Sequence, residues 1–195
     1  MNRRLLAAAF LAMLPISSQA HLVSTGFGSY YDGMAHFFLS PVDWLLVVAV
    51  GLLAGLSGAA AGRATLVALP LGWLVGGFVG TFHAGNEWPL LMIFSFSTLG
   101  ALVALDWKLP APGLAGLAAC LGALQGWANG SSMAGGDRTW PALLGAGSVV
   151  FFFATILPAI VVSLRPSWTR IAVRVLGSWI LAIGILMFGW ILRPR

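Results

Sequence analysis

Charged side chains are scarce in this chain: Asp, Glu, Lys and Arg together make up only 8% of its 195 residues. An average soluble domain carries about 25%. Hydrophobic residues account for 59% of the chain, and the mean hydropathy is +0.96. A chain with so few charges cannot cover a surface that faces water, which excludes an ordinary soluble domain. We therefore expect an all-α integral membrane protein surrounded by the lipid bilayer.

Cysteine is nearly absent as well, since Cys120 is the single cysteine of the chain. One thiol excludes an intramolecular disulfide and a metal site built from several cysteines. Acidic residues are also few: 5 Asp and Glu against 10 Lys and Arg give a net charge of +5. The basic residues are scattered between apolar runs, without the basic stripe of a nucleic-acid-binding protein. We expect no nucleic-acid partner, and loop arginines that set membrane orientation explain the excess better.

The N-terminal stretch has the pattern of an export signal. Two arginines precede the apolar run 5–14, and "SSQA" ends at Ala20 with small residues that suit a signal peptidase. This pattern predicts a signal peptide over residues 1–20 and one transmembrane domain over residues 21–195, with an uncleaved anchor as the alternative. Cleavage would expose His21, whose imidazole and free amino group could together bind a transition metal. An incidental histidine at an exposed terminus is the other interpretation.

Apolar runs separated by polar residues or proline predict a compact bundle of about six transmembrane helices. The expected spans are roughly Asp43–Ala61, Ala64–Phe82, Trp88–Asp106, Gly113–Asn129, Trp140–Leu164 and Ile171–Leu192. Most of them approach the ~20 residues that cross a bilayer. Glycines recur every four residues within these spans. They are Gly51 and Gly55, then Gly72, Gly76 and Gly80, then Gly122, Gly126 and Gly130. Such spacing predicts smooth helix faces that approach one another closely in lipid.

A cleaved signal would place the N-terminus outside the cytoplasm, in a multi-pass protein of the bacterial cytoplasmic (inner) membrane. The cytoplasmic loops would then hold the larger share of the basic residues. These are Arg63, Lys108, Arg165, Arg170 and, next to them, Arg174. Arg138, Arg193 and Arg195 would lie outside. This distribution agrees with the positive-inside rule.

The few polar residues near the spans converge on the outer face in this topology. They are His36, Asp43, His83, Glu87, Gln125 and Asn129. Gln125 and Asn129 are four residues apart and share a helix face, and polar side chains within lipid need partners. Imidazole and carboxylate together suit divalent first-row metals. Each motif alone also fits a polar turn or an interfacial loop, so it is their convergence that favours a site.

The stretch "GMAHFFLSPVDWLLVVAVGLLA", the histidine at the expected mature N-terminus and six short spans together resemble the HupE/UreJ family. These small bacterial membrane proteins are linked to hydrogenase and urease maturation and are regarded as nickel or cobalt permeases. The resemblance aligns His36 and Asp43 with the family's histidine and aspartate before the first span. Trp44 stands where a second histidine would be, and Glu87 in "NEWPLLM" resembles the acid that opens the third span.

The chain departs from the family pattern at the end of the fourth span. The family has a run resembling His-Gly-His-Ala-His-Gly there, whereas this chain has "QGWANG". Gln125, Trp127 and Asn129 therefore occupy the histidine positions, while the small residues between them remain. Amides are weak neutral oxygen ligands, and tryptophan donates only an N–H. The resemblance thus implies the family fold with a reduced set of metal ligands.

The leading functional hypothesis is a HupE/UreJ-like secondary permease for a divalent transition metal, nickel or cobalt. The expected metal ligands are His36, Asp43, Glu87, His83 and His21, and Gln125 and Asn129 are expected to line a polar pathway. No tightly bound cofactor is expected, with the nickel or cobalt ion as substrate. No Walker-type glycine-lysine loop is present in the sequence, so we expect no ATP hydrolysis by the chain itself.

Two other hypotheses stay open. In the first, the chain is a non-transporting accessory or assembly protein whose glycine faces bind a membrane partner or a second copy of the chain. In the second, it transports an organic solute that binds to the amides and Trp127. An enzyme is not expected. "GLSG" around Ser57 matches the serine motif of rhomboid-type proteases, but a nucleophilic serine needs a nearby base and every histidine is expected at the other face.

Overall fold

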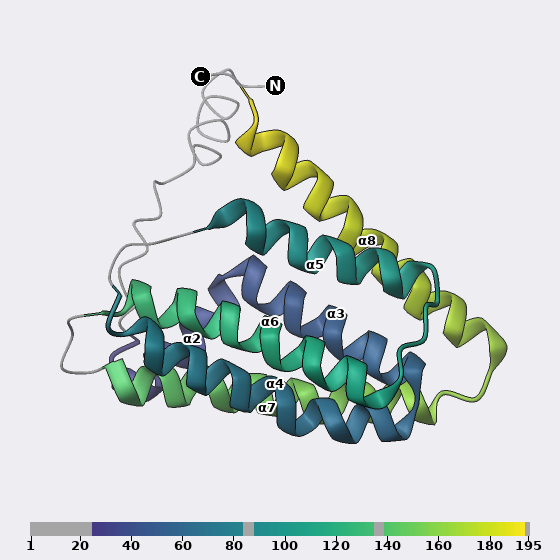
Figure 1. Cartoon of the computed structure of the whole chain (residues 1–195), viewed down its shortest axis with the longest axis horizontal. Helices are drawn as coiled ribbons and strands as arrows, with labels where there is room; N and C mark the ends of the chain where they lie inside the picture. The colour runs from purple at the N-terminus through teal and green to yellow at the C-terminus, as the bar shows by residue number, and fades with distance from the viewer. Residues whose placement is uncertain (1–24, 84–87, 135–138, 194–195) are drawn as a thin grey trace, which may run out of the picture.

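The computed structural model describes residues 25–83, 88–134 and 139–193, and these residues form seven helices and no strand (Figure 1). The helices are α2 (Ser29–Leu39), α3 (Pro41–Ser57), α4 (Ala59–Gly80), α5 (Pro89–Ala104), α6 (Ala111–Ser132), α7 (Thr139–Ser163) and α8 (Ser167–Ile191). The all-α class is therefore confirmed. The predicted signal peptide and His21 lie outside the described residues.

Helices α3 to α8 correspond to the six expected spans. Among the described residues, α4, α7 and α8 are each long and apolar enough to cross a membrane, and α2 with α3 qualifies as one span bent by 77°. Helix α5 is apolar but shorter, with 16 residues. Helix α6 has 22 residues, but it is rich in glycine and alanine and ends in the polar stretch "QGWANGSS". The described residues therefore contain three, or up to four, helical spans long and apolar enough to cross a membrane.

Two boundaries differ from the sequence-based expectation. A separate helix, α2, precedes the first span, whereas the helices expected from the sequence begin only at Asp43. The turn between the first two spans lies at Gly58 rather than at residues 62–63. Gly58 has a φ of 107°, which only glycine adopts readily, and α4 begins directly after it. Arg63 therefore lies within α4 and not in a loop, because "AAAGRATL" continues the helix without a breaker.

Helix α3 lies in the middle of the bundle. In Figure 1, α5 and α8 lie on one side of it, and α4, α6 and α7 lie on the other. Six of its apolar residues are completely buried, with 0% exposure: Leu46, Val47, Ala49, Val50, Leu53 and Ala54. A helix that is apolar on all sides is stable only when neighbours or lipid surround it. The first turn of α3 lies beside residues of α2, α5, α6 and α8.

The closest helix pair is α4 with α6, and it confirms the prediction from the glycine spacing. The two glycine stripes face each other across this pair. A Cβ atom at Gly76 would lie 1.9 Å from the carbonyl oxygen of Ala123, and one at Gly126 would lie 2.0 Å from that of Trp73. No side chain larger than hydrogen fits at such distances, so the glycines let the two backbones touch. This contact fixes the position of the polar end of α6.

Helix α2 is held against α7 in a similar way. A Cβ atom at Gly33 would lie 1.9 Å from the oxygen of Ala142, and one at Gly145 would lie 1.9 Å from the oxygen of Tyr30. The Tyr30 hydroxyl also donates a hydrogen bond to Ser148 Oγ over 2.9 Å. The 77° bend between α2 and α3 is thus held by packing on α7 and does not depend on the linking residue alone.

Candidate functional site

Asp43 lies in the first turn of α3, where a carboxylate is favoured by the positive end of the helix dipole. Pro41 opens the helix, and Ser40 caps it by accepting a hydrogen bond from the Asp43 backbone N–H over 3.4 Å. The side chain points into the protein and is only 1% exposed. A buried carboxylate needs hydrogen-bond donors or a positive charge nearby.

The donors come from α6. Asn129 Nδ2 donates to both carboxylate oxygens of Asp43, over 3.1 Å to Oδ1 and 3.2 Å to Oδ2. Gln125 Nε2 also donates to Oδ1. The same Asn129 nitrogen lies 3.1 Å from the backbone oxygen of Gln125. The two amides, which share a face of α6 as the sequence predicts, thus hold a carboxylate from α3. The spacing in the sequence did not identify this partner.

Both amides are almost fully buried, with 3% exposure for Gln125 and 4% for Asn129. Their nitrogen atoms point to Asp43, but their oxygen atoms have no such partner. Gln125 Oε1 and Asn129 Oδ1 accept no hydrogen bond from any residue in the described part of the chain. A buried acceptor without a donor costs free energy, on the order of 1–3 kcal/mol. The cluster thus keeps two buried acceptors without a donor among the described residues.

A cavity of about 290 Å³ adjoins this cluster. Its polar wall is formed by His36, Ser40, Asp43, Gln125, Asn129 and Ser132, and its apolar wall by Val42, Trp88, Pro89, Met92, Ile93, Ala128, Met187 and Ile191. The lining therefore comes from α2, α3, α5, α6 and α8. No lysine or arginine is among these described lining residues, so the carboxylate of Asp43 has no fixed cation beside it in the cavity wall.

The other predicted metal ligands have different positions. His36, near the end of α2, lines the cavity together with Asp43. His83 is exposed at the same end of the bundle, but its Nδ1 lies 3.0 Å from the backbone oxygen of Val79, and it does not line the cavity. Glu87 and His21 lie outside the described residues. Within residues 25–83, 88–134 and 139–193, no cluster of three or more His, Cys, Asp and Glu could hold a metal ion.

An aromatic contact at the cavity was not predicted from the sequence. The rings of Trp88 and Trp127 stack with their centroids 4.9 Å apart and an interplanar angle of 28°. Trp88 precedes Pro89 at the start of α5. The available signal for this contact in the sequence was Trp127, which stands where the family resemblance implies histidine. The stack joins the start of α5 to the polar end of α6, next to the cavity.

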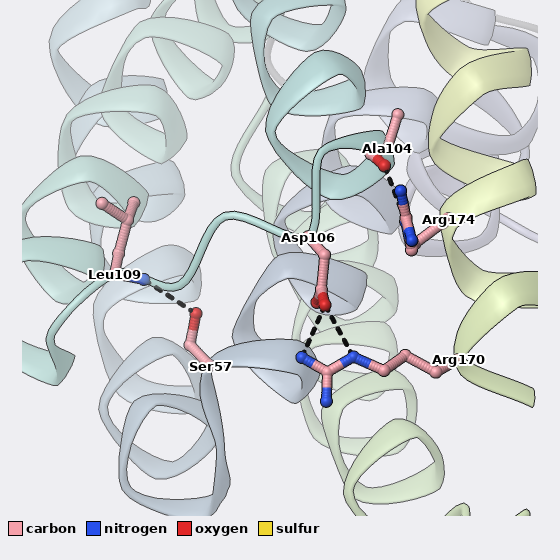
Figure 2. Close-up of polar contacts among 6 residues, drawn as sticks. All are labelled: Ser57, Ala104, Asp106, Leu109, Arg170 and Arg174. Atoms are coloured by element: carbon pink, nitrogen blue, oxygen red, sulfur yellow. Dashed lines mark hydrogen bonds and ion pairs between the residues drawn. The ribbon is translucent and has the colours of Figure 1, made fainter. Parts of the chain in front are cut away.

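The opposite end of the bundle carries a different set of polar contacts (Figure 2). Arg170 Nη2 and Nε lie 2.6 and 2.7 Å from Asp106 Oδ2, and Arg174 Nε donates to the backbone oxygen of Ala104 over 2.9 Å. Ser57 Oγ accepts a hydrogen bond from Leu109 N over 3.2 Å. Ser57 thus supports the loop between α5 and α6, whereas the described histidines lie near the other end.

Comparison with known proteins identifies the family. The family model described as HupE / UreJ protein matches residues 8–187, which is nearly the whole chain. No curated protein and no solved structure matches the chain. The chain therefore belongs to the HupE/UreJ family, a bacterial family known for membrane proteins associated with nickel or cobalt.

Proposed function

We propose that this member of the HupE/UreJ family is a secondary permease for a divalent transition metal ion, with nickel and cobalt as the first candidates. The observation that carries the proposal is the environment of Asp43. Its carboxylate is 1% exposed, held by the neutral amides of Gln125 and Asn129, and it lines a cavity with no lysine or arginine among the described lining residues. A negative charge that is buried without a fixed cation attracts a mobile one.

The donor groups of the cavity wall suit a metal ion that is intermediate between hard and soft. His36 offers an imidazole nitrogen and Asp43 a carboxylate. Such a mixed nitrogen and oxygen set suits first-row divalent ions, without the strong preference that several imidazoles would give. His83 is exposed at the same end of the bundle, and in this proposal it attracts the ion toward the cavity together with Glu87, which lies outside the described residues.

The distribution of charge supports an orientation in the membrane. Arg63, Lys108, Arg165, Arg170 and Arg174 lie at the Asp106 end of the bundle. By the positive-inside rule this end faces the cytoplasm, and the cavity then faces the outside of a bacterial inner membrane. In this orientation the first residues that an incoming cation meets are those near Asp43, and the basic end lies on the side of release.

The alternative function, an accessory protein whose glycine faces bind a partner, receives less support. The glycine stripes of α4 (Gly72, Gly76 and Gly80) and α6 (Gly122, Gly126 and Gly130) face each other within the chain, as the close approach of Gly76 to Ala123 illustrates. They are therefore not available to a partner. Replacement of the family's histidines by amides and Trp127 remains the observation in favour of this alternative.

The test is uptake of Co²⁺ and Ni²⁺ by cells or proteoliposomes that contain the full-length protein. Asp43→Asn keeps the size of the side chain but removes its charge, and it should abolish saturable uptake at unchanged protein level. Asp106→Asn is the matched control, since it removes the same charge at the other end, and its uptake should stay within about twofold of the wild type because exposed charges are screened. Equal uptake by wild type and Asp43→Asn would refute the proposal.

A further inference from the structure

The neighbouring helices α4 and α7 (Figure 1) border a groove on the surface of the bundle, separate from the Asp43 cavity. The groove consists of two adjoining hollows of about 270 and 400 Å³. Both helices are long and apolar enough to cross a membrane, so the groove lies open to lipid. We propose that it binds one anionic phospholipid, with the phosphate at Arg63 and an acyl chain along the two helices.

The two hollows form one continuous groove along the helix pair. Its lining residues on α4 recur every three or four positions from Ala59 to Leu74, which places them on one face of that helix. Those on α7 run in the opposite direction, from Val162 back to Leu144. Leu66 lines both hollows and joins them. The groove is therefore long and narrow, as an extended hydrocarbon chain requires.

The lining of the groove is apolar except at one end. Arg63 is the one charged residue among the described lining residues. The wall also contains two hydroxyl groups, but each already donates a hydrogen bond within α7. Thr155 Oγ1 donates to Phe151 O, and Ser148 Oγ donates to Leu144 O, both over 2.8 Å. The groove thus offers a hydrocarbon surface that ends at a single guanidinium group, which matches the chemistry of a phospholipid.

The charge of Arg63 has no carboxylate partner in the described part of the chain. The side chain is exposed in the first turns of α4. Asp106 is paired with Arg170, and Asp32 and Asp43 belong to the first turns of α2 and α3. A charge beside an apolar wall in lipid needs a partner, and a long arginine near a helix end extends to the level of the headgroups. The guanidinium group binds phosphate oxygens well because its N–H groups form a planar fork.

The length of the groove fits one leaflet of a bilayer. Eleven residues separate Arg63 from Leu74, which is about 16 Å along a helix. One leaflet contributes half of the hydrocarbon core, or about 15 Å. An acyl chain whose phosphate binds Arg63 therefore ends near Leu74, at the middle of the bilayer.

The surroundings of Arg63 favour an anionic lipid over a zwitterionic one. A further hollow at the same end shares Val162 with the groove and is lined by Arg165, which has no ion pair with any described residue. Basic pockets between transmembrane helices bind anionic headgroups. A second copy of the chain is a poorer source of negative charge, because the whole chain has only 5 acidic residues.

The test is titration of the purified full-length protein with phosphatidylglycerol and with phosphatidylcholine of the same acyl chains, with bound lipids counted by native mass spectrometry. The first phosphatidylglycerol should bind about fivefold or more tightly than the first phosphatidylcholine. Arg63→Gln should bring the two dissociation constants to within about twofold of each other. Arg193→Gln is the matched control, because it removes the same charge after the end of α8, and it should keep the preference.

A second variant tests the groove without changing any charge. Ala159 is exposed and lines the groove beside Arg63, so Ala159→Phe should weaken binding of the first phosphatidylglycerol about fivefold or more by occupying the place of the acyl chain. Ala172→Phe, at an exposed position of α8 that does not line the groove, should leave binding unchanged.

Three results would overturn the inference. The first is an equal preference for phosphatidylglycerol in the wild type and Arg63→Gln. The second is unchanged binding in Ala159→Phe. The third is displacement of the lipid by inorganic phosphate or by a second copy of the chain, which would show an occupant other than a phospholipid. None of the substituted residues lines the Asp43 cavity, so these results do not depend on the proposed permease.

Discussion

Two aspartates, one at each end of the bundle, have opposite environments. Asp106 is paired with Arg170 at 2.6 Å, and the two side chains are 22% and 48% exposed. Asp43 is 1% exposed and receives its hydrogen bonds from the neutral amides of Gln125 and Asn129. At the Asp106 end, Arg170 of the same chain neutralises the carboxylate. At the Asp43 end the described residues orient the carboxylate through neutral amides, and no lysine or arginine is among the described residues that line the cavity beside it.

The difference follows from which helices meet at each end. At the Asp106 end, the start of α8 brings Arg170 and Arg174 against the end of α5 (Figure 2). At the Asp43 end, α6 contributes no charged residue, and its close contact with α4 leaves no room for a longer side chain at Gly126. The glycine packing and the polar site are therefore linked, because the close contact between α4 and α6 also determines where the amides of α6 lie.

The largest effect is expected from a substitution that displaces α6, because α6 carries the two amides that hold Asp43. Gly126→Leu adds a side chain at a position where even a Cβ atom would lie 2.0 Å from the backbone oxygen of Trp73, so the helices must separate. We expect loss of most folded protein, measured as the monodisperse fraction in detergent by size-exclusion chromatography. Gly116→Leu is the matched control on the same helix, because no atom lies within 4 Å of a Cβ at that position. Equal yields of the two variants would contradict the packing described for α4 and α6.

A smaller effect is expected from removing one donor to Asp43. Asn129→Leu leaves the carboxylate with fewer donors in a buried position, and a hydrogen bond to a charged group is worth about 1.5–3 kcal/mol. We expect a lower unfolding temperature in detergent at neutral pH. Thr98→Val removes a hydroxyl whose bond to Phe94 O is exposed and should have little effect. If Asn129→Leu were as stable as Thr98→Val, the amides would not be holding a charged group.

Part of this site could be predicted from the sequence. The four-residue spacing placed Gln125 and Asn129 on one face of α6, and the glycine repeats predicted close helix contacts, because both features depend only on helical periodicity. The partner of the amides could not be predicted, since Asp43 is 82 residues from Gln125 and the contact depends on how helices pack. Helix α2 was missed for a related reason: its bend at Ser40 is held by packing on α7.

The positions of the histidines show the same limit. His36 and His83 were expected at one face of the membrane, and both lie at the Asp43 end of the bundle. Loop order predicts that the two histidines share one end of the bundle, but it cannot show which of them lines the cavity. His36 does so, whereas His83 lies against Val79 O. Metal binding by either histidine, by Glu87 or by His21 stays a prediction.

The smallest effect is expected at the Asp106 end. Asp106→Asn removes an ion pair that is open to solvent, and such pairs contribute about 0–1 kcal/mol. We expect a slightly lower unfolding temperature in low salt. The difference from the wild type should shrink in high salt, because screening weakens the pair in the wild type. A large loss of stability that salt does not reduce would mean that this aspartate is also part of a buried network.

The comparison of the two aspartates is tested most directly by equilibrium titration of purified full-length protein with Co²⁺. The wild type and Asp106→Asn should bind the ion saturably with dissociation constants within about twofold of each other. Asp43→Asn should bind at least about 100-fold more weakly, since a charge about 4 Å away in a protein interior is worth several kcal/mol. Equal affinity of Asp43→Asn and the wild type, or equal losses in both variants, would contradict the assignment of the buried carboxylate as the cation site.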